Sequence, residues 1–248
     1  MAIPAPDLRE AKRILAIQPH YDDNDIGAGG TLAALASGGA EIDYLTVTDD
    51  LVGVLDTTLS EEEATARLRS EQERAGAEIG VRRQYWLGFP DAGDYDYYTL
   101  RREIIRHIRM LRPDFIFTVD PWLPYESHGD HLKTGRAVTE AALLYGFPRL
   151  ATNPEVDRDY RAHSLGGIAL YFTQKPNEIF DISDFREQKH RALDAYQAQF
   201  TPESLEQLHL GIDFVERDCA AEKAFSHGEP LKLLSPAQLH CGLLPVDE

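Results

Sequence analysis

Apolar runs of strand length alternate with amphipathic stretches of helix length over the first 150 residues, and this alternation constrains the fold most strongly. The expected strands cover residues 13–19, 41–50, 84–89, 114–120, 167–172 and 177–183. The expected helices cover residues 31–39, 60–80, 99–113, 131–146, 183–200 and 214–225. Such alternation is typical of βαβ units. We therefore expect an α/β fold, a Rossmann-like three-layer domain with a mostly parallel central sheet flanked by helices.

Local signals support this division of the chain. Ser60 and Glu63 have the spacing of a capping box at a helix start. No internal repeat, low-complexity tract or Ser/Gly linker interrupts the sequence, so residues 1–248 are interpreted as a single domain. Residues 146–166, rich in Pro, Asn and Arg, are expected to form a long surface loop.

The charge balance excludes several classes of partner. The formal net charge of -17 repels phosphate backbones and anionic lipid, so neither nucleic acid nor membrane is an expected partner. A neutral or cationic small substrate, or a bound cation, suits this field. No apolar run has the length of a membrane span, residues 1–13 lack a signal core, and Cys219 and Cys241 are too few for a disulfide framework. We expect a cytoplasmic protein.

A histidine and three aspartates precede a glycine cluster in PHYDDNDIGAGGTLAAL, residues 19–35. The glycines suggest a dinucleotide-binding turn, with Asp49 at the position of a ribose-binding acid. That fingerprint requires a third glycine where the chain has Leu32, and the aspartates would repel a pyrophosphate. A calcium loop fails as well, because Ile26 and Ala33 replace two of its oxygen ligands.

A divalent transition-metal ion explains why these acids tolerate one another, since it neutralises their charge. His20 would leave the strand end, and Asp23, three residues later, could turn back beside it. A hydrolytic zinc site has three protein ligands and an open position. A further ligand must therefore come from elsewhere in the chain.

The segment SHGDHLKTGRAV, residues 127–138, follows another expected strand and offers that ligand. Loops at the carboxyl ends of parallel strands open on one edge of the sheet, so His131 could complete a triad with His20 and Asp23. Asp130 or another acid could orient an imidazole. The alternative is a simple helix start, with Asp130 as the cap and the histidines exposed.

Both motifs, in this order, resemble the PIG-L/LmbE-like family of metal-dependent N-deacetylases, which act on N-acetylglucosaminyl and related substrates. The family's (A/P)HPDDE and GxGGTLA segments correspond to PHYDDNDIGAGGTLAAL, and its HPDH before GRAVxxA corresponds to HGDHLKTGRAVTEA. The linking segments RSEQERAGAEIGV, LGFPDAG, RPDFIFTVDP and KHRALDAYQAQF are also similar. The resemblance covers residues 10–225.

The resemblance implies a zinc-dependent hydrolase that removes an N-acetyl group from an N-acetylglucosamine-containing or related small substrate. It makes His20, Asp23 and His131 the metal ligands and Asp22 the general base. His128 then faces the substrate carbonyl, as oxyanion stabiliser or general acid. Other divalent cations fit the same ligand types.

Further roles follow from the same resemblance. Asp130 becomes the outer partner of a metal ligand, Asp91 a sugar-contacting acid and Arg69 a substrate-contacting arginine. The resemblance also implies assembly into homo-oligomers, as trimers or hexamers. Three positions depart from the family motifs without removing a ligand or the base: Tyr21, Asn24 and Gly129.

Several residues stay open at this level. Asp49 and Asp50 suit either substrate contact or a supporting role, and the tyrosines of residues 95–98 suit either stacking on a sugar ring or an exposed surface loop. Six histidines are solitary in sequence and are expected at the surface or in packing: His107, His163, His190, His209, His227 and His240. Two other functions use the same residues differently, a metal-dependent hydrolase of another amide or ester and a non-catalytic Rossmann-like metabolite-binding domain. A glycosidase built on Asp22 and a distant acid would release reducing sugar rather than acetate.

Overall fold

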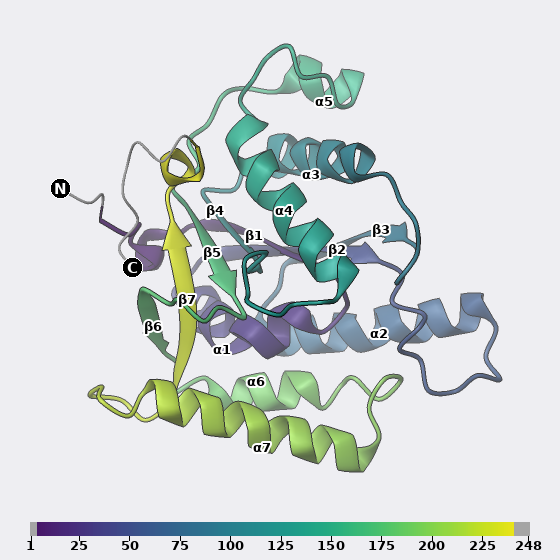
Figure 1. Ribbon diagram of the computed structural model, residues 1–248, viewed down its shortest axis with the longest axis vertical. Helices are drawn as coiled ribbons and strands as arrows, with labels where there is room; N and C mark the ends of the chain where they lie inside the picture. Colours follow the sequence, from purple (N-terminus) through teal and green to yellow (C-terminus); the bar gives the residue numbers. More distant parts are fainter. Residues whose placement is uncertain (1–3, 241–248) are drawn as a thin grey trace.

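A seven-stranded sheet crosses the middle of the computed structural model, which describes residues 4–240 (Figure 1). Its strands are β1 Arg13–Gln18, β2 Glu41–Thr48, β3 Arg83–Phe89, β4 Phe115–Val119, β5 Gly167–Tyr171, β6 Glu178–Asp181 and β7 Gly228–Leu234. Their order in the sheet is β3-β2-β1-β4-β5-β7-β6. The first five are parallel, and β7 runs antiparallel to both β5 and β6. The expected mostly parallel sheet is confirmed.

Helices cover both faces of this sheet and complete three layers (Figure 1). One face carries α1 Asp23–Ser37, α2 Glu61–Ile79 and α6 Arg186–Leu193, with α7 Pro202–Cys219 outside α6. The other face carries α3 Tyr97–Leu111 and α4 Gly129–Leu144, with the short α5 Pro154–Asp159 beyond them. Two 3-10 turns lie at Leu8–Glu10 and Pro236–Leu239. Each face has its own apolar core, because the central strands are buried on both sides.

The strand order places a switch point between β1 and β4. The chain builds outward from β1 to β3 and then returns to add β4 on the other side of β1. The two directions of crossover put α1 and α2 on one face and α3 and α4 on the other, as right-handed connections require. Ligands of open α/β sheets bind in the crevice outside the carboxyl ends of the strands at such a point. The sheet therefore predetermines where a site can form.

The sequence-based boundaries are confirmed for most elements and wrong for four segments. The capping box of Ser60 and Glu63 is present at the start of α2. Four segments differ from expectation: α1 begins at Asp23 rather than at residue 31, α6 ends at Leu193, the last helix covers Pro202–Cys219 rather than 214–225, and α5 interrupts the expected loop. Strand β7 was not expected, because GEPLKLL carries a proline and two charges, and its place between β5 and β6 depends on pairing with strands that the sequence does not connect to it.

The glycine cluster serves packing. Gly27, Gly29 and Gly30 lie inside α1, which kinks at Ala28. A Cβ on Gly27 would lie 2.2 Å from the Tyr171 ring, so only glycine lets the helix approach β5 this closely. These contacts leave the glycines no role in holding a phosphate, and they remove the basis of the nucleotide-binding alternative.

Two features bear on the environment of the chain. Within residues 4–240, no helix combines the length and apolarity that a bilayer crossing requires. Cys219 is a free thiol, and Cys241 lies outside the described residues.

We expect Gly30→Ala to lower the free energy of unfolding by about 1–3 kcal/mol, the usual cost of overpacking a core. The reason is that a Cβ at this position would lie 2.8 Å from Cβ of Ile182. Gly211→Ala, in α7, is the matched control, because its Cβ would meet nothing within 4 Å. Urea unfolding of both variants measures the difference, and equal midpoints would contradict the packing role.

Candidate metal centre and active site

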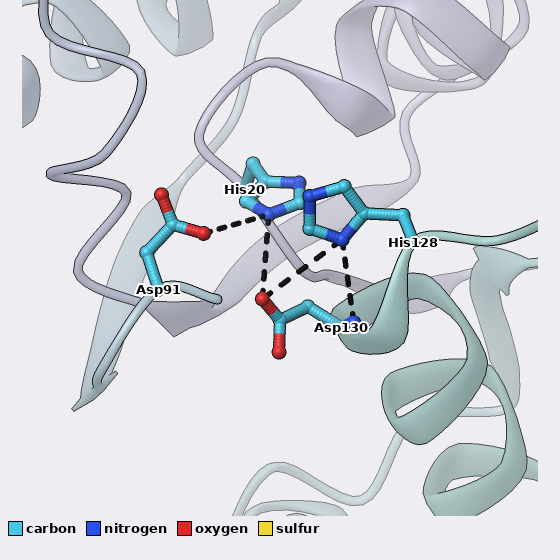
Figure 2. Close-up of side chains that lie close together, drawn as sticks. All are labelled: His20, Asp91, His128 and Asp130. Atoms are coloured by element: carbon cyan, nitrogen blue, oxygen red, sulfur yellow. Dashed lines mark hydrogen bonds and ion pairs between the residues drawn. The ribbon is translucent and has the colours of Figure 1, made fainter. Parts of the chain in front are cut away.

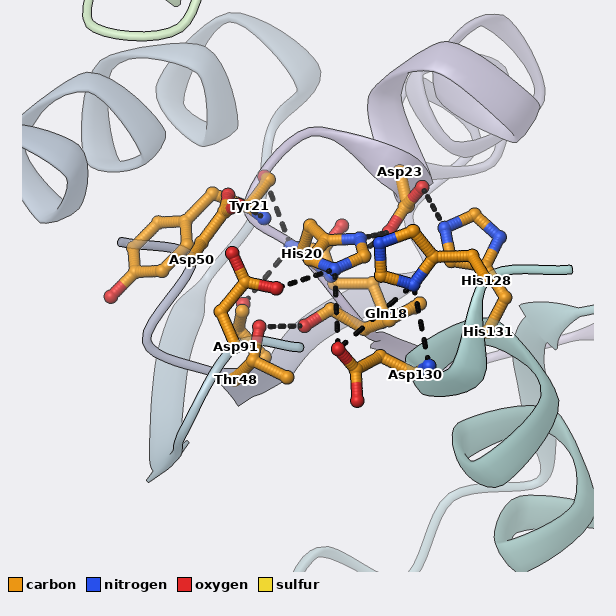
Figure 3. A network of polar contacts seen from close by, with 12 residues as sticks. Gln18, His20, Tyr21, Asp23, Thr48, Asp50, Asp91, His128, Asp130 and His131 are labelled. Atoms are coloured by element: carbon orange, nitrogen blue, oxygen red, sulfur yellow. Dashed lines mark hydrogen bonds and ion pairs between the residues drawn. The ribbon is translucent and has the colours of Figure 1, made fainter. Parts of the chain in front are cut away.

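The expected site residues, apart from Arg69, follow the carboxyl ends of parallel strands. Residues 20–23 follow β1, Asp91 follows β3, and residues 128–131 follow β4 and open α4. These segments are far apart in sequence and meet over the switch point (Figure 3). The convergence of the two motifs, which their strand-end positions predict, is present in the structure.

The Asp23 carboxylate lies between two imidazoles that come from different loops. Its Oδ2 is 3.2 Å from Nδ1 of His20, and its Oδ1 is 3.3 Å from Nε2 of His131. One donor atom from each of the three residues lies within 4.8 Å of the others, as an ion between them requires. Asp23 is also fixed by the backbone N–H of His20, which donates to its Oδ2 at 2.9 Å.

The opposite edge of the His20 ring faces a second pair of acids (Figure 2). Nε2 of His20 is 3.4 Å from Oδ1 of Asp91 and 3.9 Å from Oδ2 of Asp130, and it makes no hydrogen bond to any described residue. The ring of His128 stands edge-on to His20, with centroids 4.6 Å apart. His20, Asp91, His128 and Asp130 form a second group with the spacing of a metal site. The two groups share His20 and approach its two nitrogens from opposite sides.

The charges of this cluster compensate one another. Burial alone would lower the pKa of His20, but the carboxylates of Asp130, Asp23 and Asp91 outweigh burial and raise it. Burial would raise the pKa of Asp23, and its contacts with His131 and His20 instead hold it below the usual range. Without a cation, protons on the histidines must balance the acids. A divalent ion can take over that role.

Asp22 is buried and its carboxylate makes no capping hydrogen bond, although it stands at the N-cap of α1. Burial, followed by the neighbouring charges of Asp23 and Asp50, raises the pKa of Asp22 well above its ordinary value. The Asp22 carboxylate is therefore held near the site by its place at the start of α1, and it is not engaged in a capping hydrogen bond. Both are properties of a proton acceptor.

Asp25, the last aspartate of the cluster, anchors α1. Its Oδ1 accepts a hydrogen bond from the Tyr44 hydroxyl at 2.7 Å, and its Oδ2 accepts one from the Tyr196 hydroxyl at 2.5 Å. Burial raises the pKa of Asp25 to about 6 despite these two bonds. This explains why three aspartates share one short segment without all of them facing the site.

A buried polar network fixes the turn that carries His20 and Asp23. The Tyr21 carbonyl accepts hydrogen bonds from the side-chain amides of Gln18 at 3.1 Å and Gln72 at 3.0 Å. The Gln18 carbonyl oxygen accepts the backbone N–H of Asn24 at 2.8 Å. The Tyr21 N–H donates to Oδ2 of Asp50 at 3.0 Å. All backbone groups named here are paired, which holds the turn rigid.

Three supporting residues were not identified from sequence. Glu126 lies with Oε2 3.3 Å from Nδ1 of His131, opposite the nitrogen that faces Asp23. The Tyr95 hydroxyl donates to Oδ1 of Asp130 at 2.7 Å. Phe172 stacks on His131, with ring centroids 6.1 Å apart, and has a φ of 55°, a conformation rare for a bulky residue. Proximity to an expected ligand motif was the one sequence signal, available for Glu126 alone.

The positions left open also have supporting contacts. Oδ1 of Asp49 accepts the backbone N–H of Asp91 at 3.0 Å, and Oδ2 of Asp91 accepts that of Val52 at 3.1 Å. The alternative that Asp130 caps α4 is wrong, because Nδ1 of His128 accepts the N–H of Asp130 and His128 is the N-cap. The Asp130 carboxylate instead faces His20, while it accepts hydrogen bonds from the Tyr95 hydroxyl and the Ala92 N–H.

Arg69 and the three departures from the family motifs lie outside both metal-capable groups. The Arg69 guanidinium lies 5.1 Å from the Trp86 ring centroid and beside the Tyr21 hydroxyl, and it belongs to neither metal-capable group. Asn24 is buried and accepts a hydrogen bond from Tyr171. A Cβ on Gly129 would meet nothing within 4 Å. Gly129 opens onto a hollow of about 290 Å³ that is lined by Ala92, Gly93, Ser127, His128, Asp130 and Lys133.

The donor set fits a zinc-type ion. Two imidazoles and one carboxylate are ligands that zinc accepts in hydrolytic sites, and the three residues converge without rearrangement of the backbone. Nδ1 of His131 faces Glu126, and Nε2 of His20 faces Asp91 and Asp130, so each ring has a carboxylate behind it. Such pairs orient metal-bound histidines.

Comparison with known proteins agrees with this geometry. The family model described as PIG-L, GlcNAc-PI de-N-acetylase, matches residues 15–142. The chain is 36% identical over 199 residues to diacetylchitobiose deacetylase of Thermococcus kodakarensis. This match covers 80% of this chain and 74% of that protein. The structure of N,N'-diacetylchitobiose deacetylase from Pyrococcus horikoshii, in complex with its inhibitor MPG, superimposes with a TM-score of 0.86 at 34% identity, covering 96% of this chain and 88% of that one.

A second kind of relative matches over a shorter length. The chain is 33% identical over 164 residues to 1D-myo-inositol 2-acetamido-2-deoxy-alpha-D-glucopyranoside deacetylase of Segniliparus rotundus, and the match spans about half of that protein, 51%. All of these relatives are named as deacetylases of acetamido sugars. The matched residues 15–142 include both site motifs. The family resemblance is confirmed: the chain belongs to the PIG-L (GlcNAc-PI de-N-acetylase) family.

Proposed function

We propose that this protein is a zinc-dependent hydrolase that removes the N-acetyl group from an N-acetylglucosamine-containing or related small substrate. The observation that carries the proposal is the meeting of His20, Asp23 and His131, with donor atoms within 4.8 Å of one another, at the switch point of the sheet. Membership of a deacetylase family supports it. The relatives' names supply the substrate class.

In this proposal His20, Asp23 and His131 hold the ion, and Asp91 and Asp130 orient His20 from behind. A zinc ion at this position would polarise the amide carbonyl and lower the pKa of water to about 7. Glu126 orients His131 in the same way. The remaining chemistry depends on Asp22 and His128.

Asp22 removes a proton from the attacking water. Its buried carboxylate is not engaged in a capping bond and has a raised pKa, both of which favour proton uptake. The half-exposed His128 faces the hollow beside Gly129, where a substrate amide can enter, and donates to the carbonyl oxygen as negative charge develops there. Asp22 or His128 then returns a proton to the departing amine nitrogen. Arg69 and Asp91 are proposed as contacts to the sugar.

The acidic character of the chain suits this reaction. A net charge of -17 favours a neutral amide substrate and a cationic amine product over anionic ligands. The small hollow beside His128 limits what fits next to the reacting amide, and the open face at Gly129 leaves room for the rest of the sugar conjugate. Cytoplasmic location and assembly into trimers or hexamers stay predictions from sequence.

Acetate release tests the proposal directly. The full chain should liberate acetate and a free amine from N,N'-diacetylchitobiose or from another N-acetylglucosamine conjugate, should stop when a chelator removes metal, and should recover with Zn²⁺. An ester such as p-nitrophenyl acetate and an N-propionyl analogue serve as parallel substrates. Reducing sugar without acetate, or acetate release that a chelator does not affect, would refute the proposal.

His131→Ala and His128→Ala distinguish the two metal-capable groups, because each group contains one of these histidines. We expect His131→Ala to lower the zinc content from about one ion per chain to a small fraction, because it removes one of three ligands. His128→Ala should retain zinc and lose turnover. Elemental analysis after purification without added metal measures both, and the reverse pattern would assign the ion to the second group.

Asp22→Asn should retain the ion and lose turnover by about 10²–10⁴, the usual contribution of a general base. The amide has the shape of the carboxylate but cannot accept the proton. Acetate release and zinc content are measured on the same preparation, with circular dichroism as the check on folding. Turnover within tenfold of wild type would exclude Asp22 as the base.

A further inference from the structure

A second hollow, of about 470 Å³, lies on the face of the sheet that carries α1, α6 and α7. It shares no described residue with either metal-capable group or with the hollow beside His128. The Lys189 ammonium, which also lines it, is already paired with Glu216 and Glu229 at 2.7 Å from each. A cavity of about 150 Å³ holds a benzene molecule, so this apolar hollow has room for a chain of several methylenes. Its apolar side chains are Ile26, Phe172, Leu208, Ile212, Val215 and Pro230.

The apolar hollow begins about one helical turn from the proposed metal ligand Asp23. Asp23, Ile26 and Gly27 follow one another along α1 with spacings of i, i+3 and i+4, so all three lie on one face of the helix. Ile26 and Gly27 line the hollow. Because one turn rises by only about 5.4 Å, a group bound at the metal centre has the apolar hollow next to it along this helix face.

Phe172 is the side chain that contacts both the metal centre and the apolar hollow. It lines the hollow, and its ring lies parallel to that of His131, with an interplanar angle of 6° and centroids 6.1 Å apart. Tyr171 packs edge-on against the same ring, with centroids 4.9 Å apart. The φ of 55° is costly for a bulky residue and persists where the surroundings fix it. The Phe172 ring is therefore held in one place next to a proposed ligand.

The geometry of the substrate amide directs its acyl group away from the sugar. A secondary amide is planar and almost always trans, so the acyl carbon and the sugar carbon extend in opposite directions from the C–N bond. In the proposed function the sugar occupies the open face beside His128 and Gly129. The acyl group then points away from that face, whose described lining includes neither His131 nor Phe172. Phe172 is thus in a position to limit how long the acyl group can be.

We propose that Phe172 determines the length of the acyl group that this protein removes, because its ring closes the apolar hollow to the metal centre and leaves room for acetyl but not for longer chains. The inference rests on the proposed function and adds a specificity-determining residue to it. The reaction is the same for every acyl length. Water adds its oxygen to the carbonyl carbon, the C–N bond breaks, and both protons of the water end on the nitrogen, which gives a carboxylate and a protonated amine.

Acyl-length profiles of variants at this position test the proposal. The value of kcat/KM is measured for wild type, Phe172→Ala and Phe172→Gly with the N-acetyl, N-butanoyl and N-hexanoyl forms of the same glucosamine conjugate. Wild type should prefer acetyl. Burying one methylene is worth about fourfold, so a hexanoyl chain that enters the hollow should raise the hexanoyl-to-acetyl ratio of kcat/KM by roughly 10²-fold in either variant.

A side chain added on α7 shows whether the longer acyl group uses this hollow. Gly211 lines the hollow, and a Cβ there would meet no described atom within 4 Å, so a leucine extends into open space. In Phe172→Ala/Gly211→Leu the hexanoyl-to-acetyl ratio should return most of the way to the wild-type value. Phe172→Ala/Gly146→Leu is the matched control, because a Cβ on Gly146 is equally unobstructed and Gly146 is not among the described residues that line either hollow. Its ratio should stay high.

Two features of the design keep the result independent of folding and of metal loading. A ratio of two substrates within one preparation does not change with the fraction of active protein, and zinc content is measured alongside it. Phe172→Gly also relieves the left-handed backbone, whereas Phe172→Ala retains it, so an effect common to both comes from loss of the ring. Phe172→Leu keeps apolar packing beside His131 and should shift the preference only as far as butanoyl.

The outcomes separate this proposal from the proposed function. An unchanged acyl profile in the Phe172 variants, with chelator-sensitive acetate release intact in wild type, would overturn the role of Phe172 and leave the proposed function standing. A wild-type protein that removes hexanoyl as readily as acetyl, or a gain that survives Gly211→Leu, would do the same. Absence of acetate release from wild type would refute the proposed function and this inference with it. A gain in the variants that Gly211→Leu removes supports the proposal.

Discussion

One carboxylate shared by two imidazoles is the interaction on which the site depends. Asp23 lies within 3.3 Å of both His20 and His131, which reach it from opposite sides of the switch point. Several acids buried together would repel one another strongly at low dielectric, so the arrangement needs positive charge between them. Protonated histidines or a divalent ion can supply that charge. A bound divalent ion would therefore both stabilise the buried acids and supply the charge that the proposed reaction needs.

Close packing of α1 and two left-handed backbone conformations hold this cluster in place. Glycines let α1 approach β5 and the segment at Ile182, so that the N-terminus of the helix stands at the strand end, with Asp22 at the N-cap and Asp23 in the first turn. The positive end of the helix dipole favours carboxylates there. Asp50, which follows β2, and Phe172, which follows β5, keep left-handed backbone conformations on either side of the switch point. Strain of this kind persists where the surroundings over-determine it.

The three departures from the family motifs lie outside the proposed ligand set. Tyr21, Asn24 and Gly129 replace usual family residues, yet the structure directs the side chains of Tyr21 and Asn24 into buried contacts and leaves Gly129 beside open space. The relatives share a reaction and differ in the acetamido sugar that their names give.

Sequence determined the sheet, its parallel core strands and the two motifs at strand ends, because side-chain periodicity and strand-end position are local properties. His20, Asp23 and His131 could be grouped on that basis. Tertiary structure alone decided that Glu126 and Tyr95 support the cluster and that Asp25 faces two tyrosines. Strand β7 and the true start of α7 also escaped prediction. Each of these depends on a partner remote in the chain, and only the folded packing brings such partners within bonding distance.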